Sequence, residues 1–464
     1  MTIFDFIAFG SIILLLASVG IYKSRAIRSE SSYLFGERKI EWAALTATLV
    51  MTEFNSATLI SFSSLGYAAG FWALIIPCIF LIGLLFYALT VAKKWKAFDG
   101  VSVAGFFSQR YGEGLGRFAS LLLLLAMSGF SAAYIKSLSL LFLPLFPQLN
   151  QWLLSTLLLL IIFLMSLRGG LLAIIRTDLL SLLLMVLFFP LVALFMWKSP
   201  SLPDPSYSLP SLAESQAILP LRFVFSLTIL TMFTYILAPW YGQKIFAAKS
   251  GRVAFWAVVS SAVLVFLLYS SAILSTAFLR YRGFSFHSSE QALPYLINKC
   301  LPLGIRGAAY ALLFATSATT LTGVWSAMSA MWIGDFLKQH SSEKQRDYKR
   351  SAVATLCFAA ISLLLANTLV DRVFDKLILA NIPIAALSFG LLAGFYWKRA
   401  SRLGAYLSIA MGCATGVGFY LIYGEAGGYT WYWAVLGIPL TFATGIATSL
   451  LPSKKLSTSY PRPL

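Results

Sequence analysis

The chain contains 464 residues, of which 59% are hydrophobic and only 11% are charged, and its formal net charge is +18. Soluble domains usually carry about 25% charged residues, so this composition excludes a single water-soluble globule and predicts an all-α membrane protein in a lipid bilayer. The lysines and arginines lie in short stretches between apolar runs, which is typical of membrane topology and argues against a nucleic-acid partner.

About 13 apolar runs are each long enough to cross roughly 30 Å of hydrocarbon as a helix. In chain order these predicted spans are 4–22, 42–68, 72–92, 118–144, 151–168, 171–197, 223–246, 253–279, 304–337, 351–370, 374–397, 404–424 and 429–451. The first run carries Asp5 at its start and lacks a basic flank, so we interpret it as a permanent span rather than a signal peptide.

The loops between these spans alternate in charge. Lysines and arginines gather in 23–39, 93–117, 244–252, 338–350 and 398–402, whereas the loop 145–150 on the opposite side has none. The positive-inside rule therefore predicts a cell inner membrane protein with its N-terminus outside and its C-terminal tail in the cytoplasm. The Pro- and Ser-rich segment 199–220 is predicted to be an external loop between two halves.

Polar residues within the hydrocarbon are costly and are therefore candidates for a functional site. The second span carries Glu53 among several hydroxyls, and the seventh carries Tyr235 and then Pro239, which removes a backbone donor. These spans begin two possible five-span sets, spans 2–6 and 7–11, and the second set is inverted because five is odd. Such helices in inverted halves indicate a binding site at the midplane; ordinary helix packing is the alternative.

The ninth span carries three threonines on one face. Thr316, Thr319 and Thr320 have i, i+3, i+4 spacing, so their side chains point the same way. Three hydroxyls can offer hard oxygen ligands to a small cation. Hydrogen bonding to a neighbouring helix explains the same pattern.

Two further charges lie inside predicted spans. Lys136 is near the middle of the fourth span and needs a partner, which could be Glu53 or an anionic group of the substrate. The lysine could therefore act in a binding cavity or form a purely structural ion pair. Asp178 lies deeper in the sixth span than Arg176, whose side chain can reach the interface. The only histidines, His287 and His340, are in loops, so haem or His-ligated metal chemistry is not expected and the chain is not expected to be an enzyme.

Several short motifs share an order with a known family. They are Tyr33-Leu34-Phe35-Gly36 with Arg38, Gly66-Tyr67 with Gly70, Gly169-Gly170-Leu171 with Thr177-Asp178, Gln243-Lys244-Ile245-Phe246-Ala247-Ala248-Lys249, and Tyr396-Trp397-Lys398-Arg399 with Gly404-Ala405 and Gly412. On these motifs, across roughly residues 30–415, the sequence resembles the sodium:solute symporter family, whose members share the inverted-repeat LeuT-type fold.

The resemblance implies a sodium site between spans 2 and 9. The backbone carbonyls of Met51 and Phe54 match the span 2 ligands, and Thr316, Thr319 and Thr320 fall at the span 9 positions, counted back from Asp335. Sodium is expected as a coupling ion rather than a prosthetic group. Asp178 matches an acidic position that assists sodium passage toward the cytoplasm.

The resemblance also implies which residues bind the substrate. Glu53 occupies a family position where an uncharged polar residue can stand, and Thr58, Tyr235 and Asn381 fall near cavity positions. Lys136 is included as a candidate that would bind a carboxylate. Departures from the family are Ser181 in place of Gln, Lys244 in place of Arg, and an inserted Glu37.

Taken together, the sequence predicts a 5+5 inverted-repeat core with one extra N-terminal and two extra C-terminal helices. Residues 1–30 form the extra helix and first cytoplasmic loop, 31–451 the transporter core with peripheral helices, and 452–464 the cytoplasmic tail. The predicted function is sodium-coupled import of a small solute by alternating access. Lys136 suggests a solute with a carboxylate, while sugars, vitamins and siderophore-like compounds stay open. A proton-coupled carrier that relays protons through Glu53 and Asp178 is the main alternative; a membrane enzyme or a sensor unit is a weaker one.

Overall fold

The structure is a computed structural model that describes residues 2–24, 38–98, 100, 102–166, 171–198, 209–336, 347–425 and 428–451. These residues form helices and connecting segments, and their single β-type contact is an isolated bridge between Ile40 and Ala248. The motif residues 33–36 and 169–170 and the predicted tail 452–464 lie outside the described residues.

Helices occupy the described part of every predicted apolar run. In the first half they are α1 (Ile3–Ser24), α3 (Trp42–Glu53), α4 (Ser56–Ala69), η2 (Gly70–Leu74), α5 (Ile75–Tyr87), η3 (Ala88–Ala92), α6 (Lys93–Ala97), α7 (Val103–Tyr111), α8 (Glu113–Phe142), η4 (Leu143–Leu145), α9 (Gln151–Ser166) and α10 (Leu171–Lys198). In the second half they are α11 (Leu212–Ile218), α12 (Leu221–Tyr235), α13 (Pro239–Phe246), α14 (Gly251–Tyr281), η5 (Ser289–Gln291), α15 (Ala292–Tyr295), η6 (Leu296–Cys300), α16 (Ile305–Phe336), α17 (Asp347–Thr368), α18 (Val373–Leu379), α19 (Ile382–Ala386), α20 (Ser388–Tyr396), α21 (Arg402–Tyr423), α22 (Tyr429–Tyr432), η7 (Trp433–Gly437) and α23 (Ile438–Leu450).

The predicted thirteen crossings exceed the number of long apolar helices. Among the described residues, 8 helical segments are long and apolar enough to cross a membrane, or up to 9 when α11 and α12, which meet at 44°, count as one. Helix α1, α9 and α17 contain shorter apolar stretches. The structure therefore supports a multi-pass membrane protein, while the number thirteen stays a prediction.

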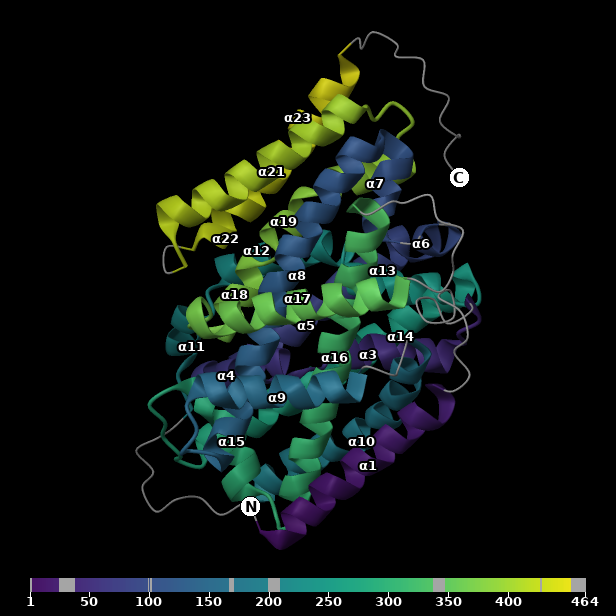
Figure 1. The fold of residues 1–464 in the computed structure, drawn as a ribbon. Helices are drawn as coiled ribbons and strands as arrows, with labels where there is room; N and C mark the ends of the chain where they lie inside the picture. Colours follow the sequence, from purple (N-terminus) through teal and green to yellow (C-terminus); the bar gives the residue numbers. More distant parts are fainter. Residues whose placement is uncertain are drawn as a thin grey trace.

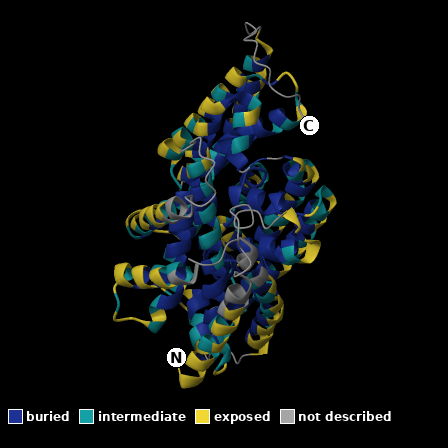
Figure 2. Ribbon diagram, turned by 45° about the vertical axis from the view of Figure 1, so that its right-hand side comes forward, coloured by how far each residue is buried: buried dark blue, intermediate teal, exposed yellow. Residues whose placement is uncertain are grey.

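The outer faces of the helices are apolar. On α10, Leu183, Leu187, Leu191 and Leu194 are all exposed at spacings that place them on one side of the helix. Monomeric soluble proteins rarely expose apolar patches of this kind. Figure 2 shows exposed residues along the outer helices and buried residues through the middle of the molecule, as expected when lipid covers the outside.

The helices that carry the polar residues form the interior. Helices α3, α4, α8 and α16 are buried along most of their length, and α14 packs against α3, α4 and α5. Figure 1 shows α1 at one end of the molecule and α21 and α23 together at the other. The peripheral helices therefore flank a central bundle that contains both predicted polar spans.

Two helices of this bundle are interrupted. Between α3 and α4 the chain leaves helical geometry at Phe54, and the extended residue Asn55 caps α4 through a reciprocal pair of bonds with Thr58. Between α12 and α13 the break ends at Pro239, which occupies the first turn of α13, where its missing N–H costs nothing. The sequence predicts the second interruption through Pro239, whereas at the first it identifies the polar residues around Glu53.

The starts and ends of these interrupted helices are joined to each other. The Ile40 amide donates to the Ala247 carbonyl at 3.0 Å, and the Lys249 amide donates to the Ile40 carbonyl at 2.8 Å. The Trp95 indole donates to the Ile236 carbonyl, within the break between α12 and α13, at 2.9 Å. The first two contacts join the start of α3 to the end of α13, and the third joins α6 to the break between α12 and α13.

Close packing of α4 on α14 gives a test of the bundle. A Cβ at Gly66 would lie 2.6 Å from the Ile273 carbonyl oxygen, whereas a Cβ at Gly418 on α21 would meet nothing within 4 Å. Overpacking typically costs about 1–3 kcal/mol, so Gly66→Ala is expected to lower the thermal unfolding midpoint of the purified protein. Gly418→Ala is the matched control, and equal midpoints for the two variants would contradict the packing described.

Candidate functional site

The break between α3 and α4 removes the helical donors of two carbonyls. The Asn55 amide, which an unbroken helix would direct to Met51, donates to the Glu53 carbonyl at 3.0 Å. The Thr58 amide, which would be directed to Phe54, donates to the Asn55 side-chain oxygen at 3.3 Å. The carbonyls of Met51 and Phe54 therefore become available as ligands, because helix ends leave backbone oxygens without partners in the helix.

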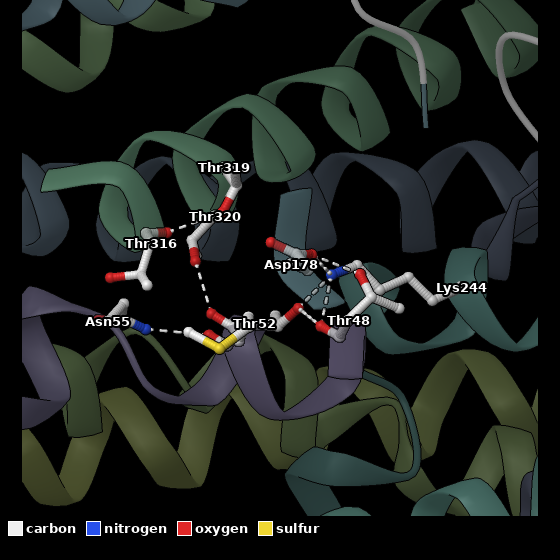
Figure 3. A network of polar contacts seen from close by, with 9 residues as sticks. Thr48, Thr52, Asn55, Asp178, Lys244, Thr316, Thr319 and Thr320 are labelled. Carbon is white, nitrogen blue, oxygen red and sulfur yellow. Dashed lines mark hydrogen bonds and ion pairs between the residues drawn. The ribbon is translucent and has the colours of Figure 1, made fainter. Parts of the chain in front are cut away.

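Helix α16 brings hydroxyls to this break. Thr320 Oγ1 donates to the Met51 carbonyl at 3.2 Å. Thr319 Oγ1 donates to the Thr316 carbonyl at 3.1 Å, and Thr316 Oγ1 donates to the Leu313 carbonyl at 3.1 Å. Figure 3 shows Thr316 and Thr320 projecting from α16 toward the broken helix. The structure thus brings one of the three predicted hydroxyls, that of Thr320, into contact with a carbonyl of the first break, while those of Thr316 and Thr319 bond within α16.

A second contact joins α16 to the start of α4. The Ser56 amide donates to Ser317 Oγ at 3.1 Å, and Ser56 Oγ shares a hydrogen bond with Ser137 Oγ of α8 at 2.8 Å. All three serines are buried. These residues were not predicted as part of a site, although the pattern Asn55-Ser56-Ala57-Thr58 is a helix N-terminus signature that could have identified the capped end.

A buried charge cluster lies beside this oxygen-lined region. Asp178 of α10 accepts a hydrogen bond from Thr48 Oγ1 at 2.6 Å, and the Lys244 ammonium of α13 is 3.8 Å from the same carboxylate oxygen. Lys244 also donates to the Thr48 carbonyl at 2.8 Å and to the Thr52 hydroxyl. Figure 3 shows Lys244 and Asp178 meeting at Thr48. Because Thr48 precedes Met51 by one helical turn, the cluster adjoins the candidate ion site along α3.

Lys244 lies elsewhere than its sequence context suggested. It belongs to a run of basic residues that we counted with a cytoplasmic loop, yet its side chain is only 7% exposed and lies within the bundle. The signal that could have located it is the proline five residues earlier, since Pro239 begins a short helix rather than a loop. A lysine in such a helix needs a buried partner, and Asp178 is that partner.

A cavity adjoins the same break. It contains about 650 Å³ of space not filled by atoms, part of which opens to solvent. Four of the predicted substrate residues are on its wall, namely Glu53, Thr58, Tyr235 and Asn381. Tyr235 Oη donates to a carboxylate oxygen of Glu53 at 2.7 Å, which joins α12 to the end of α3.

Lys136 is not among the residues that line this cavity. Its ammonium donates to the side-chain oxygen of Gln151, at the start of α9, at 3.0 Å. The partner of Glu53 in the structure is Tyr235 and not Lys136. The five predicted substrate residues therefore separate into four that share the cavity and one that lies apart from it.

The Glu53 carbonyl is the most heavily bonded backbone group at the break. It accepts hydrogen bonds from Thr58 Oγ1 at 2.6 Å, from Tyr269 Oη of α14 at 2.8 Å and from the Asn55 amide at 3.0 Å. Tyr269 was not predicted as a site residue. Its ring also stacks on the Phe54 ring with the centroids 5.7 Å apart. Helix α14 therefore packs against the break and stabilises its geometry.

The broken helices, the facing hydroxyls and the adjoining cavity fit the class of helical membrane transporters, and the family comparison bears this class out. The model of the sodium:solute symporter family matches residues 33–412. The chain belongs to the sodium:solute symporter family.

Solved structures with low sequence identity share the fold. A Na⁺-coupled sialic acid symporter in a substrate-bound outward-open state is 20% identical, with a TM-score of 0.76 over 98% of this chain and 100% of that one. MhsT in complex with L-phenylalanine is 16% identical, with a TM-score of 0.51 over 89% and 100%. A manganese transporter mutant of Eremococcus coleocola is 14% identical, with a TM-score of 0.51 over 91% and 96%. The comparison with curated proteins gave no match.

The buried pair of Lys244 and Asp178 gives a test of the cluster. Removing one partner of a buried pair typically costs about 3–5 kcal/mol, because the other charge stays buried and unpaired. We expect Lys244→Met and Asp178→Asn each to lower the thermal unfolding midpoint strongly. The double variant is expected to lose much less than the sum of the two losses. Losses that add fully would show that the two side chains act independently.

Proposed function

We propose that the protein is a sodium-coupled symporter that imports a small solute by alternating access. The observation that carries this proposal is the meeting of the Met51 carbonyl, freed by the helix break, with the Thr320 hydroxyl of α16. The family supports sodium as the coupling ion. In this proposal the ion is held by the carbonyls of Met51 and Phe54 and by α16 oxygens of Thr316, Thr319 and Thr320.

Sodium at this position would connect two parts of the bundle. Helix α3 bears the carbonyls and α16 bears the hydroxyls, so an ion held by both favours the state in which these helices are close. A ligand shifts a conformational equilibrium only by its differential affinity for the two states. Separation of α16 from the break would remove ligands and release the ion, which is how sodium binding would be coupled to the change of access.

The solute is proposed to bind in the cavity on the other side of the break. The backbone carbonyl of Glu53 accepts a hydrogen bond that holds the break, and the same residue lines the cavity. Occupation of the cavity can therefore affect the geometry of the ion site through one residue. The carboxylate-bearing solute suggested by the sequence depends on Lys136, whose described contact is with Gln151.

The proposed exit for sodium passes Asp178. From Met51 the polar groups of α3 continue through Thr52 and Thr48 to the Asp178 carboxylate. In the described arrangement the Lys244 ammonium occupies the end of this row. We propose that Lys244 and sodium compete for the same oxygens, so that release of the ion accompanies return of the lysine.

The membrane placement follows the sequence argument. We propose a cell inner membrane protein with thirteen crossings, in which spans 2–6 and 7–11 form the inverted halves. The N-terminus is outside, and the core 31–451 is followed by the cytoplasmic tail 452–464. The two broken helices support this division, since α3–α4 begins the first proposed half and α12–α13 begins the second.

Proton coupling is the second candidate, because Glu53 and Asp178 are both buried carboxyl groups. The arrangement favours sodium over protons, since Asp178 already has an ammonium partner and the freed carbonyls of α3 cannot take part in proton relay. Stabilisation by sodium chloride, compared with potassium chloride at equal ionic strength and fixed pH, separates the two candidates. A proton carrier would respond equally to both salts.

The site assignment predicts the behaviour of Thr320→Ala. A ligand that binds only the folded state raises its stability as its concentration rises above the dissociation constant. We expect wild-type protein to show a sodium-specific rise in its thermal unfolding midpoint, and Thr320→Ala to need roughly tenfold more sodium, a loss of about 1.4 kcal/mol.

The control for this variant is Thr322→Ala. The Thr322 hydroxyl donates to the Ala318 carbonyl of its own helix at 2.7 Å, so its loss should leave the sodium response unchanged. A Thr320→Ala protein with the wild-type sodium response would show that the ion is bound elsewhere.

A further inference from the structure

The cavity beside the first helix break has a single acidic side chain on its wall. Among the sixteen described residues that line it, Glu53 is the one acidic residue, and none is lysine, arginine or histidine. The chain as a whole has 35 lysines and arginines against 17 aspartates and glutamates. A negative wall in such a basic protein indicates that the cavity suits a cation better than an anion.

Two side-chain acceptors, those of Glu53 and Asn381, lie on the wall among hydroxyl and indole groups that can donate. Glu53 presents a carboxylate, and the side-chain oxygen of Asn381 is buried without a hydrogen-bond partner among the described residues. The Asn381 amide nitrogen is already engaged, because it donates to the Leu377 carbonyl at 3.1 Å. An unpaired buried acceptor is costly. Because Asn381 lines the cavity, a rotation of its side chain that turns the oxygen inward would let a solute donor satisfy it.

The backbone amides that would usually bind a solute carboxylate are already hydrogen-bonded. Helix N-termini bind anions through their first free amides, and α4 begins at this cavity. Its first three amides are taken, since Ser56 donates to Ser317 Oγ at 3.1 Å, and Ala57 and Thr58 donate to the Asn55 side chain at 3.0 and 3.3 Å. A carboxylate in the cavity would therefore find no free donor at the start of α4.

The two buried or half-buried lysines near this region do not replace that receptor. Lys136 donates to Gln151, and Lys244 donates to Thr48 and Thr52 beside Asp178. Neither lysine lines the cavity. A solute carboxylate would face Glu53 without a cationic partner, and like charges at short range in a low dielectric repel strongly.

Aromatic rings form much of the remaining wall. They are Phe62, Phe80, Phe130, Tyr134, Tyr235, Trp240 and Phe374. Phe130 and Trp240 pack with their centroids 4.9 Å apart, and Phe80 lies 6.1 Å from Tyr235, the residue that bonds Glu53. Aromatic faces attract ammonium groups, above all where water is excluded.

We propose that the solute carries a positively charged amine, protonated or quaternary, with Glu53 as its counter-charge and the Asn381 oxygen as an acceptor for a second donor group. This inference rests on the proposed function, since it names the substrate class of the same symporter. It differs from the carboxylate that the sequence suggested. Specificity then arises because neutral or anionic solutes of the same size leave Glu53 without a counter-charge and the Asn381 oxygen without a hydrogen-bond donor.

The test compares charged and uncharged probes of matched shape. Purified protein in sodium chloride is heated with choline, ethanolamine or propylamine, and in parallel with 3,3-dimethylbutanol, the uncharged isostere of choline, and with propionate. We expect at least one amine to raise the thermal unfolding midpoint in sodium while the isostere and propionate do not. The absence of a shift with every amine, or a shift with propionate, would overturn the inference.

Variants connect the effect to the cavity. Glu53→Gln keeps the side-chain shape and is expected to weaken the amine effect at least tenfold. Asn381→Leu removes the unpaired oxygen and is expected to weaken it less, and it carries the test should Glu53→Gln fail to fold. Glu41→Gln is the control, because Glu41 is exposed and pairs with Lys249 at 3.2 Å, away from the cavity. An amine effect that survives both cavity substitutions would place the binding elsewhere.

The sodium response distinguishes this inference from the proposed function. Wild-type protein that is stabilised by sodium but by no amine refutes the substrate class and leaves sodium coupling intact. Protein that responds to an amine equally in sodium and in potassium refutes sodium coupling and leaves the substrate class intact.

Discussion

The structure depends on how one break in a buried helix is satisfied. In hydrocarbon every backbone polar group needs a partner, and unpaired groups cost several kcal/mol each. Asn55 solves half of this problem, since its side chain caps the amides at the start of α4. The carbonyls at the end of α3 are satisfied differently: Glu53 has several donors, while Met51 receives the Thr320 hydroxyl. The amides at the break are therefore fully hydrogen-bonded within the protein. The Met51 carbonyl has a hydroxyl partner, which a cation could replace.

In the proposed mechanism, this asymmetry would let one interruption bind two ligands. Carbonyl and hydroxyl oxygens facing α16 suit a small cation, while the carboxylate and aromatic rings facing α12 and α8 suit an organic cation. Glu53 contributes to both regions, through its backbone carbonyl at the break and through its side chain at the cavity. Lys244 adds a third cation to the same region, held by Asp178 and by the carbonyl of Thr48. The balance among these three positive charges is the property on which coupling would depend.

The sequence predicted the fold class well because hydrocarbon imposes a simple pattern. Long apolar runs became helices, and the two interruptions were visible as polar residues around Glu53 and as Pro239. The wall residues Thr58, Tyr235 and Asn381 were found through family motifs, and the structure places them on one cavity. That placement needed three-dimensional information, because the residues come from helices far apart in the chain.

Other features were not predicted from the sequence. Lys136 was assigned to the middle of its span. Because α8 extends from Glu113 to Phe142, Lys136 lies near the C-terminal end of the helix, where its ammonium donates to Gln151. Lys244 was counted with a loop because basic residues usually mark one. Helix α7 lies between two predicted spans, and the eleventh span is divided into α18, α19 and α20. Burial and pairing decided these cases, and neither is encoded in hydropathy alone.

Direct binding of radioactive sodium to the purified protein tests the central claim. The account predicts saturable binding that sodium chloride displaces and potassium chloride at the same concentration does not. Binding that does not saturate, or that both salts displace equally, would contradict the claim that the broken helix and α16 together form a sodium site.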